Sequence, residues 1–296
     1  MSTPVVQLPR QFEGLSLSTL VHDLIESCPD GLPAEISIDF SDLRFIRPAG
    51  VVFLSNLAHW LNRNGTKVVF SGMDVSRAPV RFLDDSLFFE QHCGKKLRPG
   101  AAPRGTTQPL VKIAHKDSHS WLDLTLIPWL ADRLSITKAS LYSVKACISE
   151  LFNNIQDHTQ LDIGSIFVQH FPNEKRVTIS LSDFGLGIPE KVRQKVPGLT
   201  DSQAIIQAVQ DGFTTKSKPT NKGVGLDYLL KTVVLGNGGQ VTIYSQEGIV
   251  RFSRNGTDLQ TYPFQDVGFC PGTTIDISLR TDTIEVLPEE REELQW

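Results

Sequence analysis

Residues 141–158 read LYSVKACISELFNNIQDH, a stretch that combines an apolar stripe with a polar row. Its apolar residues recur every three or four positions, which predicts a helix with one face in a core. Glu150, Asn154 and His158 stand four residues apart, so they line one side of that helix beside the stripe. Such a row can face a pocket, although a solvated helix side is the commoner arrangement.

The next segment contains two predicted strands, at 163–171 and 176–182, because apolar and polar residues alternate in both. The second strand leads directly into DFGLGI at 183–188. An aspartate at a strand end can accept a hydrogen bond from an amino group on a flat base, and two glycines let the backbone approach a ligand closely. A plain turn would also explain the aspartate and the glycines.

Two later motifs are also typical of ligand contact. Residues 212–226 read GFTTKSKPTNKGVGL, with three lysines and no acidic residue, and lead into a predicted helix at 225–235. Lysines, threonine hydroxyls and glycine amides before a helix favour a polyphosphate, although a lone GxG is often only a tight turn. PGTT at 271–274 opens the last predicted strand, where a threonine could hydrogen-bond a base; a simple β-turn is the alternative.

The order of these motifs resembles the GHKL ATP-binding fold: a helix with E-L-x-x-N-x-x-x-H, then D-x-G-x-G, F-T-T-K, G-x-G-L and G-T. That superfamily includes gyrase, the heat-shock chaperone, histidine kinases, mismatch-repair ATPases and anti-sigma serine kinases. The resemblance covers about residues 120–280. It implies an α+β two-layer sandwich that binds ATP or ADP together with Mg²⁺.

The resemblance also implies a role for each matching residue. Asn154 would coordinate Mg²⁺ through its amide oxygen, and Glu150 would orient or deprotonate the attacking water. Asp183 would read adenine. His158 would lie near the phosphates, with a partly buried structural histidine as the alternative. The other implied nucleotide-binding positions are Gly185, Gly187, Thr214, Thr215, Lys216, Gly223, Gly225 and Thr273.

A smaller α/β unit is predicted before this region. A strand at 35–40, a helix from Val51 to Asn64 and a strand at 66–71 form a parallel βαβ pattern, and one more helix is predicted at 77–89. The stretch IDFSDLRFIRPAGVVFLSNLAHWLNRNGTKVVFSG resembles a STAS domain. In antagonists of that family a phosphorylatable serine precedes the helix glycine, but here Ala49 has no hydroxyl. We therefore expect a docking module, whose deletion should leave ATP binding intact.

The basic, Gly- and Pro-rich run GKKLRPGAAPRGTTQP at 94–109 predicts a linker, with a phosphate contact as the alternative. The predicted organisation is therefore a STAS-like domain (1–93), the linker, an ATP-binding domain (110–280) and an acidic tail (281–296).

Composition restricts the setting. The chain has 296 residues and a net charge of -4, which disfavours direct binding to nucleic acid or to an anionic membrane surface. No apolar run approaches the ~18 residues of a membrane span, and the first residues lack a secretory pattern. The 4 cysteines are scattered, so neither a zinc ribbon nor a disulfide framework is indicated. We expect a cytoplasmic protein.

Among the branches of the superfamily, a lone ATP domain fused to a STAS-like module favours the anti-sigma type. The expected function is that of a regulatory protein that binds ATP and Mg²⁺ and acts on a protein partner, as a serine/threonine kinase or an ATPase switch. A non-catalytic nucleotide-sensing scaffold and an atypical histidine kinase stay open as alternatives, and so does a homodimer. His119 lacks the acidic neighbour of a phosphoacceptor, so we interpret His115 and His119 as surface residues.

Overall fold

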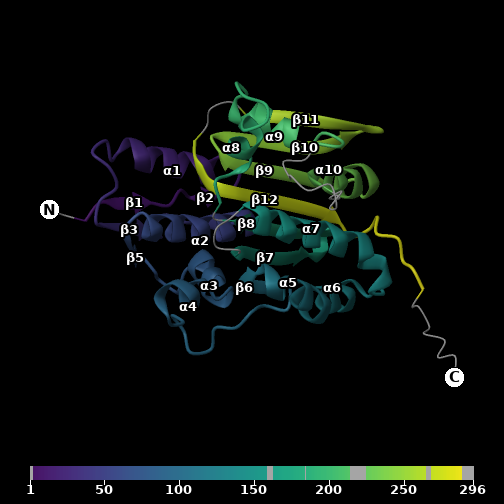
Figure 1. The fold of residues 1–296 in the computed structure, drawn as a ribbon. Helices are drawn as coiled ribbons and strands as arrows, with labels where there is room; N and C mark the ends of the chain where they lie inside the picture. The colour runs from purple at the N-terminus through teal and green to yellow at the C-terminus, as the bar shows by residue number, and fades with distance from the viewer. Residues whose placement is uncertain (1–2, 159–162, 184, 214–224, 265–267, 289–296) are drawn as a thin grey trace.

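The computed structural model describes residues 3–158, 163–183, 185–213, 225–264 and 268–288. Within them, a three-stranded sheet and a two-stranded pair form the N-terminal region, and a seven-stranded sheet forms the larger C-terminal region. Figure 1 shows the N-terminal region lying beside the large sheet. The fold is thus the predicted combination of a smaller α/β unit with an α+β layer structure.

The three-stranded sheet is parallel throughout, in the order β1-β3-β5. Its elements are β1 (Val5–Gln7), β3 (Glu35–Asp39) and β5 (Lys67–Ser71), with β2 (Gln11–Phe12) and β4 (Phe45–Ile46) paired nearby and α1 (Ser16–Glu26) and α2 (Pro48–Arg63) as helices. The predicted strand–helix–strand unit is confirmed, because α2 connects the parallel neighbours β3 and β5.

The single helix predicted at 77–89 is wrong. The chain forms two helices there, α3 (Ala78–Asp85) and α4 (Phe88–Cys93), separated by Leu87 with a φ of +62°. The break turns the chain so that Phe88 and Phe89 are both fully buried, where they pack edge-on against Phe40. Periodicity could not predict this break because its cause is tertiary packing.

The seven-stranded sheet has the order β11-β10-β9-β12-β8-β7-β6, and each neighbouring pair is antiparallel. Its strands are β6 (Thr107–Ala114), β7 (Ile163–Phe171), β8 (Arg176–Asp183), β9 (Gln240–Gln246), β10 (Gly248–Asn255), β11 (Asp258–Phe264) and β12 (Cys270–Arg280). The predicted strands β7, β8 and β12 are confirmed, and the β10–β11 hairpin was missed.

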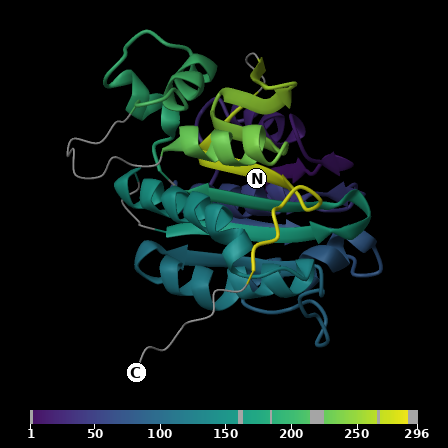
Figure 2. The ribbon, with the colours of Figure 1, turned by 90° about the vertical axis from the view of Figure 1, so that its right-hand side faces the viewer.

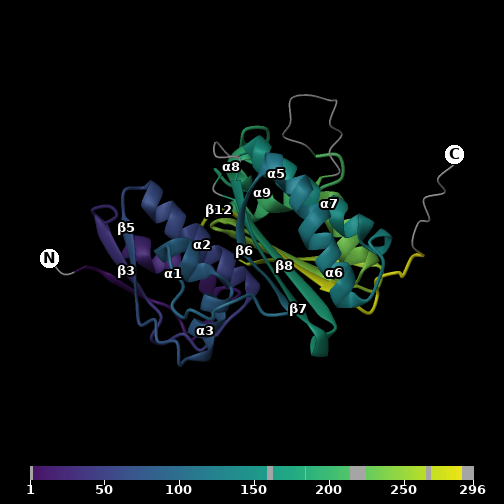
Figure 3. The same cartoon turned by 90° about the horizontal axis from the view of Figure 1, so that it is seen from below.

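Helices cover one face of this sheet, and the main core lies between the two layers (Figures 2 and 3). The helical elements are α5 (His115–Trp121), the helical turn Leu122–Leu126, α6 (Ile127–Leu134), α7 (Tyr142–His158), α8 (Ile188–Arg193), α9 (Asp201–Ala208), and α10 (Leu226–Leu229) continued by Leu230–Gly236. Helix α7 follows the predicted amphipathic helix to within one residue.

The N-terminal region packs on the opposite face of the same sheet. Helix α2 contacts β7, β8 and β12, and five fully or almost fully buried side chains from the large sheet join the N-terminal core: Leu110, Phe167, Tyr244, Ile249 and Cys270. The segment predicted as a linker follows the same surface: fully buried Asp84 accepts hydrogen bonds from the amides of Leu97 and Arg98, and β6 begins at Thr107. The N-terminal core therefore contains side chains of both regions and is separate from the main core on the other face of the sheet.

Candidate functional site

A cleft opens between the helical layer and the seven-stranded sheet. Among the residues that line it are six of the predicted site positions: Glu150 and Asn154 on α7, Asp183 at the end of β8, Gly187 before α8, Gly225 before α10, and Thr273 on β12. Apolar side chains, including those of Leu151, Ile155, Leu181, Ile188 and Ile275, line the remaining wall. The cleft thus combines an apolar wall with a few polar groups, which is typical of a small-molecule site.

Asp183 stands opposite Thr273 in the β8–β12 ladder. Its Oδ1 accepts a 2.7 Å hydrogen bond from the amide of Gly185, and the amide and hydroxyl of Thr273 also donate to this carboxyl. The residue as a whole keeps some exposure, but its carboxyl group lies deep among neighbouring atoms. Burial raises the pKa of Asp183 to about 6, against the opposing effect of these three hydrogen bonds.

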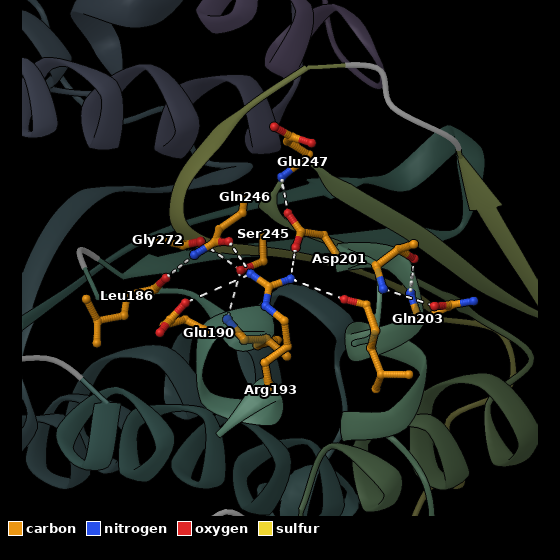
Figure 4. A network of polar contacts seen from close by, with 12 residues as sticks. Leu186, Glu190, Arg193, Asp201, Gln203, Ser245, Gln246, Glu247 and Gly272 are labelled. Atoms are coloured by element: carbon orange, nitrogen blue, oxygen red, sulfur yellow. Dashed lines mark hydrogen bonds and ion pairs between the residues drawn. The ribbon is translucent and has the colours of Figure 1, made fainter. Parts of the chain in front are cut away.

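The glycine loop after Asp183 is held against the β9–β10 turn (Figure 4). The amide of Ile188 donates to Ser245 Oγ over 2.9 Å, and Gln246 Nε2 donates to the carbonyl of Leu186 over 2.7 Å. Gly187 has a φ of +90°, and a Cβ there would lie 2.8 Å from Ser245 Oγ. Only glycine fits this close approach without strain.

Arg193 on α8 connects this loop to α9. Its guanidinium pairs with Asp201 at the start of α9 and donates to Gln246 Oε1 over 3.1 Å. Asp201 in turn accepts the amide of Glu247 over 2.8 Å, as Figure 4 shows. The loop is therefore fixed from three elements, and the spacing of residues in the sequence did not predict this network because several of its members are distant in the chain.

The polar row on α7 has a neighbour that the sequence analysis also missed. Asn153 Nδ2 donates to Glu150 Oε2 over 3.3 Å, and Asn153 Oδ1 lies 2.9 Å from Nε2 of His115. His115 is half-buried, and His119 is exposed as predicted. Glu150 is thereby held on one side by an amide that is itself oriented from α5.

Several of the predicted site residues are not among the described residues that line the cleft. His158 is the last residue of α7, and its side chain is not part of the description. Thr214, Thr215, Lys216 and Gly223 lie outside the described residues. Gly185 contributes its amide to Asp183. Two further lining residues, Lys191 and Phe213, were not predicted; Phe213 directly precedes Thr214 in the basic loop, which was its only sequence signal.

Metal binding would depend on few protein ligands here. Within the described ranges, no group of three or more His, Cys, Asp or Glu side chains could hold a metal ion. Asn154 supplies a hard amide oxygen in the cleft wall, one turn of α7 from the Glu150 carboxylate. This donor set fits Mg²⁺, which usually keeps water and phosphate oxygens in its shell.

Comparison with known families agrees with this geometry. The family model described as histidine kinase-, DNA gyrase B-, and HSP90-like ATPase matches residues 142–283, from the first residue of α7 to beyond the end of β12. This segment is therefore an ATP-binding domain of the GHKL type, as predicted. No curated protein matches the chain. The STAS-like resemblance lies outside the matched segment and stays a prediction.

Among the helices of the described ranges, none is both long and apolar enough to cross a bilayer.

Proposed function

We propose that the cleft binds ATP together with Mg²⁺ and that the protein is a nucleotide-dependent regulator of a protein partner. The observation that carries this proposal is the convergence, in one cleft of a GHKL-type domain, of the α7 polar row, the Asp183–Thr273 pair and the glycine loop. Each motif alone is common, but together they supply a base-reading group, an apolar wall and a phosphate end.

At the base end, the Asp183 carboxylate accepts a hydrogen bond from the 6-amino group of adenine. Guanine carries a carbonyl at this position, so two acceptors would face each other. Thr273 stands beside Asp183 and provides a hydroxyl at the same edge. Ile155 and Ile188 offer apolar surface for the flat ring. The pocket therefore favours adenine over guanine.

At the phosphate end, Asn154 provides the protein oxygen for Mg²⁺, which would neutralise part of the phosphate charge. Glu150 is assigned as the general base: it accepts a proton from water as the water oxygen bonds to the γ-phosphorus, and the bond from that phosphorus to ADP breaks. Lys191 adds a positive charge to the cleft. Thr214, Thr215, Lys216 and Gly223 keep their proposed role as a lid on the phosphates, and His158 its proposed place nearby.

The class of activity follows from what receives the phosphoryl group. Transfer to a serine or threonine hydroxyl makes the protein a kinase, and transfer to water makes it an ATPase switch. Glu150 lies in the cleft and is oriented by Asn153, which favours turnover over a purely sensing role. The N-terminal region, packed on the back of the sheet, is the proposed docking module for the partner.

The test combines calorimetry with phosphate transfer. We expect ATP and ADP to bind and GTP to bind much more weakly. Incubation with γ-labelled ATP and a cell lysate then separates the alternatives: label on a protein indicates a kinase, free phosphate an ATPase, and neither a nucleotide-sensing scaffold. Equal affinity for ATP and GTP would contradict the assignment of Asp183.

A further inference from the structure

The beginning of β12 lies between the N-terminal region and the nucleotide cleft. On one side, the amide of Phe269 donates to the carbonyl of Ser18 over 3.0 Å, and Asn56 Nδ2 donates to the carbonyl of Pro271 over 2.6 Å. On the other side, Thr273 donates to Asp183. A segment of only five residues, 269–273, thus connects the two regions.

This segment is not held by regular strand pairing alone. The β9–β12 register shifts between Cys270 and Thr273, and the β8–β12 ladder begins only at Thr273. Pro271 and Gly272 therefore form a bulge without ladder partners. Side chains replace the missing pairing: the Pro271 carbonyl accepts from Asn56, and the Gly272 carbonyl accepts from Ser245 Oγ over 2.8 Å.

Gly272 allows the bulge to pack closely against Asp183 in the cleft. Its φ is +69°, and a Cβ there would lie 2.5 Å from the carbonyl oxygen of Asp183. Ser245 Oγ is also 3.1 Å from Thr273 Oγ1. A shift of the bulge would therefore move the groups that fix the Asp183 carboxyl.

Asn56 is the contribution of the N-terminal region to this arrangement. It lies on α2, 215 residues away from Pro271 in the chain, and is 1% exposed. Within the described residues its Oδ1 has no hydrogen-bond partner, so the bond from its Nδ2 to Pro271 is the role that the structure gives this deeply buried amide. A buried amide whose oxygen makes no hydrogen bond lowers the stability of the folded protein, so stability does not explain why an asparagine stands here. The residue therefore has a positional role.

We propose that Asn56 is a positioning residue for base recognition, through which the N-terminal region sets the adenine preference of the cleft. The Asn56 amide holds the 271–272 bulge, the bulge places Thr273, and Thr273 orients the Asp183 carboxyl. This inference rests on the proposed function of the cleft as an adenine nucleotide site.

The experiment compares ADP with inosine diphosphate, which differs at the base by having an oxygen in place of the 6-amino group. Calorimetry on the full chain gives the affinity ratio of the two nucleotides. Asn56→Leu removes the donor at similar volume, and we expect the ratio to fall by roughly 2- to 12-fold, the range that the loss of one hydrogen bond typically causes. Asp183→Asn gives the affinity ratio of ADP to inosine diphosphate that remains when the carboxylate that recognises the 6-amino group is absent.

Ser55→Ala is the matched control. Ser55 is also fully buried on α2, and its side chain contacts Nε2 of His92 on α4 at 3.0 Å. We expect this variant to keep the wild-type ratio even if its melting temperature falls. If Asn56→Leu does not fold, Asn56→Ser removes the same contact with a smaller side chain.

The outcomes are distinguishable. A wild-type protein without preference for ADP over inosine diphosphate contradicts the proposed function and, with it, this inference. A wild-type preference that persists unchanged in a folded Asn56 variant, with both affinities falling in parallel, overturns the inference and leaves Asn56 a purely structural residue.

Discussion

At the scale of single residues, Asp183 shows how binding and stability oppose each other. Its carboxyl is buried, and this burial raises its pKa to about 6 from an ordinary value of 3.8. The folded protein therefore holds a proton that the unfolded chain releases between about pH 4 and pH 6. By linkage, the contribution of Asp183 to stability is greatest below about pH 4 and decreases as the pH rises through 6.

We therefore expect Asp183→Asn to stabilise the nucleotide-free protein at pH 7.5, because the amide carries no charge that must be buried. The gain should be on the order of 1–3 kcal/mol in the free energy of unfolding. It should vanish at pH 4, where the wild-type carboxyl is protonated. Chemical denaturation at both pH values measures the difference, and an equal effect at both would contradict the burial argument.

The two polar residues on α7 are expected to separate metal binding from chemistry. Asn154→Ala removes the proposed Mg²⁺ ligand, so ATP affinity in the presence of Mg²⁺ should fall and its dependence on Mg²⁺ should flatten. Glu150→Ala should keep nucleotide binding while hydrolysis decreases by about 10²–10⁴-fold, the usual contribution of a general base. Calorimetry with and without Mg²⁺ and a phosphate-release assay measure both. Wild-type behaviour of both variants would exclude α7 as the nucleotide-binding helix.

At the scale of elements, periodicity predicted the parts whose pattern is local. Helix α7 and strands β7 and β8 have regular apolar spacing, and their observed bounds differ from the predicted ones by at most one residue. The β10–β11 hairpin was missed since its outer strand is largely exposed and lacks a buried face. The network around Arg193 could not be predicted, because sequence spacing contains no information on which distant side chains meet.

Gly187 provides the test of the glycine loop as an element. Alanine there would adopt an unfavourable φ of +90° and place its Cβ 2.8 Å from Ser245 Oγ. We expect Gly187→Ala to destabilise the protein by about 1–3 kcal/mol and to weaken ADP binding, because the loop must move away from the β9–β10 turn. Thermal melting and calorimetry measure the two effects.

Gly198 is the matched control for backbone strain. Its φ is +83°, and no atom lies within 4 Å of a Cβ built at this position, outside the cleft. Gly198→Ala should therefore lower stability through strain while ADP affinity stays at the wild-type value. Loss of ADP binding in both variants would show that general destabilisation, and not the loop geometry, causes the effect.

At the scale of the whole molecule, the N-terminal region is part of the core and not a tethered module. Phe82 of this region packs edge-on against Phe167 of β7, with 5.8 Å between the ring centroids. The ring centroids of Trp60 and Phe269 are 5.9 Å apart. The sequence could suggest two units from a change in composition. It could not predict that both would bury apolar residues against one sheet, since contact between distant segments leaves no periodic signal.

This shared core changes what removal of residues 1–93 should do. Deletion would expose Phe167, Tyr244, Ile249 and Cys270, which are at most 3% exposed in the full chain. Burial of a large apolar side chain contributes about 1.5–3 kcal/mol, so the combined loss is of the same order as the 5–15 kcal/mol that typically separates folded from unfolded domains. We therefore expect the shortened chain to aggregate or to melt far below the full chain, in place of the intact ATP binding that the sequence suggested.

Co-expression of the two regions as separate chains tests whether they must be covalently joined or only have to be present together for folding. Residues 1–106 and 107–296, expressed together as two chains divided before β6, should associate through the same buried residues and recover ADP binding. The full chain should melt in one cooperative transition, because unfolding of the N-terminal region would expose the side chains of the large sheet that its core buries. Size-exclusion chromatography and scanning calorimetry measure these outcomes. A soluble, monomeric 107–296 fragment with wild-type ADP affinity would contradict the shared core and would also remove the route by which Asn56 reaches the cleft.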